Sequence, residues 1–86
     1  SLDRADRLAV RRSTQSVLEN NRTGQRASWR NPDSGHAGTV TPTKTYELAS
    51  GKYCREYQQT VTIDGKVQYA FGKACRQPDG SWKIVN

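Results

Sequence analysis

Residues 53–76 read YCREYQQTVTIDGKVQYAFGKACR, two stretches rich in β-branched and aromatic residues that meet at Asp64-Gly65. An Asp-Gly pair in this setting is the strongest short-range signal for a β-hairpin closed by a two-residue turn. The sequence therefore predicts two antiparallel strands, one on either side of this turn. In that register Cys54 lies opposite Cys75 at a non-hydrogen-bonded position, where Cα atoms approach to about 4.5 Å, a separation that a disulfide accepts.

The faces of this ribbon conflict in the two-residue-turn register, because Tyr57 and Phe71 then point to opposite sides. A three-residue turn with Gly65 left-handed would bring the two rings to one side, but it would separate the cysteines. One extra residue in the second strand would satisfy both demands, and glycine is the residue type at which a bulge forms most easily. We therefore expect a β-bulge near Gly72-Lys73, with Tyr57 and Phe71 both in the core.

We expect one disulfide, between Cys54 and Cys75. It would close a loop of about 22 residues and stabilise the fold by on the order of 3 kcal/mol through the entropy of the unfolded chain. The alternative is a pair of free buried thiols, the usual state in a reducing cytosol. Two cysteines and one histidine fall short of the four ligands of a structural zinc site, so we expect no metal.

A helix is predicted over residues 2–20, a stretch free of glycine and proline and rich in helix formers. Asp3 and Asp6 stand near its start, where the helix dipole favours acidic side chains. The Asn-Asn pair at 20–21 and Gly24 should end it, because these residue types tolerate the left-handed conformation.

After the helix the pattern changes to short alternations of polar and apolar residues, broken by turn residues. Segments 31–35 and 77–80 carry the clearest turn signals. Pro42 cannot donate to a ladder, so it should lie at a sheet edge or bend its strand. The sequence thus predicts an α+β fold with a single domain over residues 1–86, in which the helix packs on a four- to five-stranded antiparallel sheet within 25–86. The expected strands are 25–30, 38–48, 53–63, 66–76 and 81–85.

Composition limits the possible functions. The chain has 86 residues, 33 % of them hydrophobic, and a formal net charge of +6, so its core must be thin and its surface attracts polyanions. Nucleic acid is one candidate partner and an anionic cell-envelope polymer or lipid headgroup layer is another, and charge alone does not separate them. No stretch is long and apolar enough to span a bilayer. The chain starts at Ser1 without a secretory leader, so we expect any export signal or lipid anchor to have been removed.

Few residues suggest catalysis. His36 is the only imidazole, and it stands in a Ser-Gly-His-Ala-Gly segment that is more typical of a surface loop than of a hydrolase triad. The sequence therefore predicts no catalytic residue and no cofactor.

Arginines close to aromatic residues favour a binding role. Cations and rings on one sheet face suit stacking on sugars or bases together with phosphate contacts. Aromatic residues at strand spacing also fill cores, and that alternative applies to both tryptophans. The candidate binding residues are Trp29, Arg30, Arg55, Arg76 and Trp82.

Three segments resemble one known family. Residues 29–38 (WRNPDSGHAG), 53–57 (YCREY) and 72–82 (GKACRQPDGSW) are similar to the C-terminal domain of the seventeen-kilodalton surface antigen family first described in rickettsiae. The resemblance extends from the helix to the last strand. Members of that family look like outer-membrane lipoproteins of proteobacteria, often with a glycine-rich, membrane-associated segment before this domain. Neither that segment nor a lipidated cysteine stands in these 86 residues.

The resemblance implies a place in the cell envelope, associated with the outer membrane and either periplasmic or surface-exposed. It brings no family-wide catalytic activity or ligand. We therefore expect a non-enzymatic surface antigen domain, a structural or binding module that contacts an envelope component or partner protein. The alternative is a nucleic-acid-binding domain that uses a basic aromatic sheet face.

Overall fold

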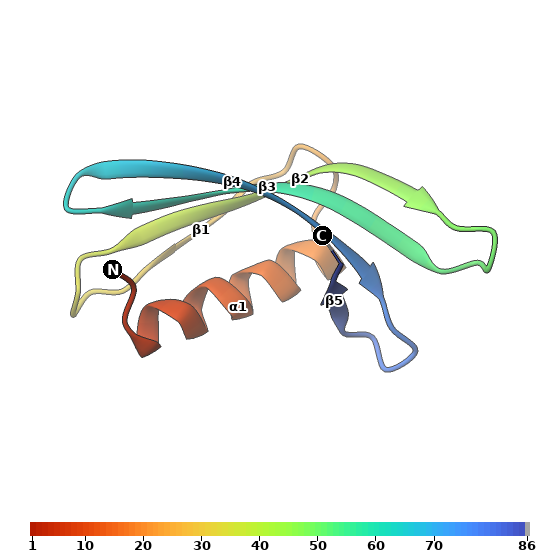
Figure 1. Cartoon of the computed structure of the whole chain (residues 1–86), viewed down its shortest axis with the longest axis horizontal. Coiled ribbons are helices and arrows are strands. Elements are labelled where there is room, and N and C mark those ends of the chain that lie inside the picture. The colour runs from red at the N-terminus through yellow and green to blue at the C-terminus, as the bar shows by residue number, and fades with distance from the viewer. Residues whose placement is uncertain (86) are drawn as a thin grey trace.

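The computed structural model describes residues 1–85, in which one helix is followed by five strands. The strands form a single antiparallel sheet in the order β1-β2-β3-β4-β5, so that each lies beside its neighbour in the chain. The helix packs under one face of this sheet (Figure 1). The predicted α+β architecture is therefore confirmed. The elements are α1 (Arg4–Asn20), β1 (Ala27–Arg30), β2 (Ala37–Glu47), β3 (Tyr53–Ile63), β4 (Lys66–Arg76) and β5 (Trp82–Ile84).

Both ends of α1 are set by side chains of the helix and by backbone geometry. Asp3 caps the first turn by accepting a hydrogen bond from the backbone N–H of Asp6 at 2.8 Å, and the Asp6 carboxylate accepts from the N–H of Asp3 at 2.9 Å. At the other end Asn21 is extended, with φ −96°. The helix therefore ends at the predicted Asn-Asn pair, but neither asparagine is left-handed as expected, and Gly24 takes that conformation in the turn that follows, with φ +87°.

The hairpin of β3 and β4 follows the two-residue-turn register without interruption. Asp64 and Gly65 have φ values of 51° and 79°, which a turn with two left-handed residues requires. Pairing then runs regularly from Ile63 beside Lys66 to the two cysteines at the far end. Cys54 and Cys75 form the predicted disulfide, with their Cα atoms 4.0 Å apart.

The expected bulge near Gly72-Lys73 is wrong, and the contact between Tyr57 and Gly72 explains why none is needed. The two residues face each other, and the tyrosine ring covers Gly72 so closely that a Cβ there would collide with it. Tyr57 is thereby 3 % exposed, whereas Phe71 points to the other side of the sheet and is 77 % exposed. The expectation that Phe71 belongs to the core is also wrong.

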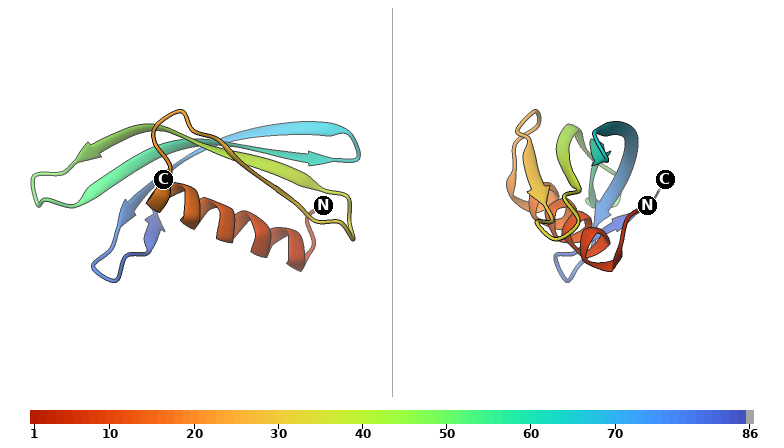
Figure 2. Two further views of the ribbon diagram at one scale, coloured as in Figure 1. Left: turned by 180° about the vertical axis from the view of Figure 1, so that it is seen from behind. Right: turned by 90° about the vertical axis from the view of Figure 1, so that its left-hand side faces the viewer.

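The two faces of the sheet differ because α1 covers only one of them, as the end-on view in Figure 2 shows. The covered face and the helix enclose the core, while β4 presents exposed Val67, Tyr69 and Phe71 on the open face. The molecule is 43 Å long, whereas a 17-residue helix spans about 25 Å. The hairpin ends therefore project beyond α1 in opposite directions (Figure 1). The core consists of Val17, Leu18, Val40, Tyr57, Ala74 and Trp82.

The pairing of two strands, β2 and β5, is irregular or incomplete. The pairing of β2 with β3 shifts register between Pro42 and Lys44, so the ladder is irregular at the proline where an edge or a bend was predicted. Pairing of β5 is confined to Ala74–Arg76 of β4. Among the described residues, the preceding Lys66–Gly72 therefore has a strand neighbour on one side only.

Candidate binding site

Three of the five predicted binding residues meet at the C-terminal end of α1. Arg55 on β3, Arg76 on β4 and Trp82 on β5 line an open recess of about 390 Å³ beside the last helical turn. Trp29 is elsewhere, packed against Gly38 on β2 with 8 % exposure. Arg30 is exposed on the open face of the sheet. We call the recess beside the last turn of α1 the basic recess. The side chains that matter for its chemistry are Glu19, Arg22, Tyr53, Arg55, Arg76 and Trp82.

Arg55 reaches from β3 beneath the end of α1 and holds the last helical carbonyls. Its Nη1 donates to the carbonyl oxygen of Leu18 at 2.7 Å and to that of Val17 at 3.4 Å, and its Nε donates to Thr45 Oγ1 at 2.8 Å. The final carbonyls of a helix lack partners within the helix and carry its negative dipole end, so a cation is favourable there. With 6 % exposure, burial lowers the pKa of the Arg55 guanidinium from its usual value.

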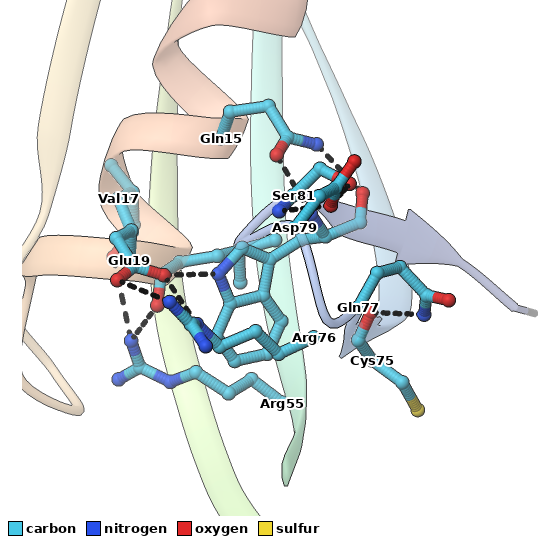
Figure 3. Close-up of polar contacts among 11 residues, drawn as sticks. Gln15, Val17, Glu19, Arg55, Cys75, Arg76, Gln77, Asp79 and Ser81 are labelled. Atoms are coloured by element: carbon cyan, nitrogen blue, oxygen red, sulfur yellow. Dashed lines mark hydrogen bonds and ion pairs between the residues drawn. The ribbon is translucent and has the colours of Figure 1, made fainter. Parts of the chain in front are cut away.

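Arg76 and Trp82 both bind the carboxylate of Glu19 (Figure 3). Arg76 donates from Nε at 2.9 Å and from Nη2 at 3.3 Å, and the Trp82 indole N–H donates at 2.9 Å. These bonds lower the pKa of Glu19, and the bond that Arg76 donates to Glu19 raises the pKa of Arg76. The ion pair is about half exposed, so its main effect is to position the two side chains rather than to stabilise the fold.

Gln15 fixes the short strand β5 against the helix. Its amide nitrogen donates to the carbonyl of Trp82 at 2.7 Å, and its amide oxygen accepts from the N–H of Trp82 at 2.9 Å. The side chain thus supplies the two backbone bonds that a further strand would make (Figure 3). As a result Gln15 fixes the backbone of Trp82 and Glu19 fixes its indole ring, which forms one wall of the basic recess.

A second polar cluster, which sequence reasoning missed, lies at the other end of α1. Asp6 stands in the first turn of the helix, as predicted, but its side chain is fully buried. Burial alone would raise its pKa, yet the bonds that it accepts outweigh this and hold the pKa far below the usual range. The donors are His36 Nδ1 at 2.7 Å, Ser34 Oγ at 2.8 Å, Asn31 Nδ2 at 2.9 Å and the backbone N–H of Asp3 at 2.9 Å.

The geometry of this cluster is that of a loop anchor. A nucleophilic serine must give its proton to a histidine, but the hydroxyl of Ser34 donates to Asp6 instead. His36 Nδ1 contacts the other oxygen of the same carboxylate, at 2.7 Å. Together these contacts tie segment 31–36 to the first turn of α1. Within residues 1–85, no three His, Cys, Asp or Glu side chains gather closely enough to hold a metal ion.

Comparison with known proteins identifies close relatives. A 17 kDa surface antigen of Rickettsia conorii is 53 % identical over 85 residues, which cover 99 % of this chain and 54 % of the relative. The 17 kDa surface antigen of Rickettsia bellii is 52 % identical over 85 residues, and that of Rickettsia prowazekii 52 % over 84. The chain spans about half the length of these curated relatives. No solved structure matches it.

The family assignment extends over most of the chain. The sequence profile of the 17 kDa outer membrane surface antigen family matches residues 16–83, a range that includes the basic recess and the disulfide. Among the residues that the structure describes, no helix has the length and apolar character needed to cross a membrane. A surface antigen family implies a location in the cell envelope or at the cell surface. The chain therefore belongs to the 17 kDa outer membrane surface antigen family.

Proposed function

We propose that this domain is a non-enzymatic binding module of the cell envelope, whose basic recess contacts an anionic envelope component or partner protein. The observation that carries the proposal is the charge balance of the recess. Arg22, Arg55 and Arg76 line it, and Glu19 supplies the one carboxylate among the lining residues. Because Arg76 is already paired with Glu19, two positive charges are left for a partner.

The rim of the recess adds an aromatic surface to this charge. Tyr53 lines the recess and is half exposed. A tyrosine gives a large contact area at a low cost in side-chain entropy, and arginine and tyrosine are both enriched at the energetic centres of interfaces. The net charge of +6 on the whole chain increases the rate at which an anionic partner approaches.

The hydrogen bonds of Ser34 and His36 support a binding role for the domain over a catalytic one. His36 Nδ1 contacts the buried Asp6, and Ser34 is bonded to the same carboxylate. In a hydrolase triad the serine hydroxyl donates to the histidine, whereas here it donates to Asp6, so Ser34 and His36 do not form a nucleophile–base pair. The nucleic-acid alternative has less support, because Trp29 and Trp82, the two rings predicted to stack on bases, are mostly buried, at 8 % and 7 % exposure.

Site-specific photo-crosslinking in intact bacteria tests the proposal. A photoreactive phenylalanine analogue replaces Tyr53 on the rim of the recess, and the matched control carries the same analogue at Tyr69. Both side chains are well exposed, but Tyr69 lies on the open face of the sheet. We expect a defined crosslinked envelope component from position 53 and none from position 69.

Each other outcome counts against the proposal in its own way. Crosslinks from position 69 alone would move the binding surface to the open face. Crosslinks to nucleic acid would favour the alternative function. If neither position gave a defined product, the domain would have no binding partner at these surfaces, and the proposal would fail.

A further inference from the structure

The guanidinium of Arg55 has one nitrogen that the fold does not use. Nε bonds to Thr45 and Nη1 bonds to the helix carbonyls, whereas Nη2 has no hydrogen-bond partner in the described part of the chain. Every buried side-chain nitrogen or oxygen of these residues does have a partner, so Nη2 must be in contact with solvent. Arg55 lines the basic recess, which is therefore where Nη2 opens. In Figure 3 the outermost nitrogen of Arg55 points away from α1 and carries no dashed line.

The charge of Arg55 is not neutralised by an anion. Its side chain is almost wholly buried, and it forms no ion pair with any carboxylate of residues 1–85. The helix carbonyls present only about half an elementary charge. A cation that is shielded from water and only partly compensated binds an anion more strongly than a fully solvated one does.

The rest of the recess determines which anion fits. Arg22 is exposed on the rim and offers a second guanidinium, while Leu18, Tyr53 and Trp82 form an apolar side. Glu19 places a negative charge in the same space. Arg76 pairs with this carboxylate, and the apolar side favours an anion attached to a carbon chain over inorganic phosphate.

We propose that the basic recess is a binding site for a single carboxylate group. One carboxylate oxygen accepts from Nη2 of Arg55, the other is held by Arg22, and the ring of Tyr53 packs against the carbon chain beside it. The proposal deepens the function proposed above and rests on it for biological meaning. Its physical test, however, needs no cellular partner.

The test follows amide and arginine side-chain signals of the 15N-labelled chain by NMR while hippurate, an aromatic carboxylate, is added. Hippuramide provides the same ring without the charge, inorganic phosphate provides a dianion, and sodium chloride at equal ionic strength provides the background. The variant is Arg22→Gln. Its matched control is Arg26→Gln, which removes the same charge from an exposed position outside the recess.

We expect hippurate to shift the signals of Arg55 and its neighbours Thr45 and Tyr53 saturably, and hippuramide to leave them in place. Arg22→Gln should weaken binding about tenfold, the usual effect of losing one charge-assisted hydrogen bond. Arg26→Gln should leave the affinity within about twofold, because an exposed charge outside the site is screened. Arg55→Lys keeps the charge without Nη2 and should abolish binding; if that variant does not fold, Arg22→Gln decides.

Four results would overturn the proposal. These are equal shifts with hippuramide, equal shifts with sodium chloride, equal weakening by both glutamine variants, and tighter binding of phosphate than of hippurate. Failure of this site and failure of the proposed function can be told apart. Saturable hippurate binding without a crosslinked partner in cells would support the carboxylate site and contradict the proposed function. A crosslinked partner without hippurate binding would support the proposed function and contradict the carboxylate site.

Discussion

Truncation of Tyr57 to alanine should destabilise the domain far more than truncation of Phe71, although the two aromatic residues occupy adjacent positions of paired strands. Tyr57 is buried in the core and covers Gly72, so its loss leaves a cavity between α1 and the sheet. A buried aromatic ring reduced to alanine costs about 3–5 kcal/mol. Phe71 lies on the open face, where a substitution changes stability by about 0.5 kcal/mol or less.

Urea denaturation followed by circular dichroism measures the difference. With a slope of about 1.5 kcal/mol per molar urea for a small domain, Tyr57→Ala should lower the midpoint by about 2 M or more, and Phe71→Ala by a few tenths at most. Should Tyr57→Ala be unfolded without urea, Tyr57→Leu gives a smaller and measurable loss of the same origin. If Phe71→Ala lowered the midpoint as much as Tyr57→Ala, both rings would lie in the core, and the regular ladder between β3 and β4 would be wrong.

Three further predictions concern the disulfide and two titrating groups. Replacement of both Cys54 and Cys75 by alanine should cost about 3 kcal/mol, given their sequence separation of 21, and lower the Tm by about 15–20 °C in calorimetry; an unchanged Tm would contradict the entropic argument. Because the folded state lowers the pKa of Asp6, the stability that this carboxylate provides is present above about pH 4 and is lost as the pH falls below that value. Asp6→Asn should therefore flatten the acid limb of a plot of urea midpoint against pH, and a limb of unchanged slope would show that other groups dominate. Burial raises the pKa of Tyr57, so the stability that its neutral phenol gives the folded state is present below about pH 10 and is lost at higher pH. Tyr57→Phe should reduce the alkaline loss of stability, and identical alkaline limbs in the two proteins would argue against this assignment.

The hairpin could be predicted from sequence because a local signal fixed its register. Asp64-Gly65 defines the turn, and the turn alone brings Cys54 beside Cys75 across two 11-residue strands. The bulge was predicted wrongly because both apolar rows of the ribbon were assumed to need burial. A single 17-residue helix covers one face, so the row that contains Phe71 stays exposed. The sequence did contain the corrective signal, since glycine opposite an aromatic residue is a favourable cross-strand pair.

The buried roles of Asp6 and Arg55 could not be predicted from local patterns, because each depends on residues far away in the chain. Asp6 binds side chains 25 to 30 positions later. Arg55 binds carbonyls 37 and 38 positions earlier. The nearest thing to a signal is that the last turn of α1 contains no basic residue of its own. Its negative end therefore required a cation from elsewhere in the fold.

The one-sided stretch Lys66–Gly72 of β4 leaves backbone hydrogen-bonding groups without a strand partner on one side. Free amide and carbonyl groups along such a margin can template another chain, and hydrophobic side chains at alternate positions would interlock two copies. What opposes this is mutual repulsion, since every molecule carries a charge of +6. Conditions that screen this repulsion, such as high ionic strength, should therefore favour pairing of two molecules along this edge.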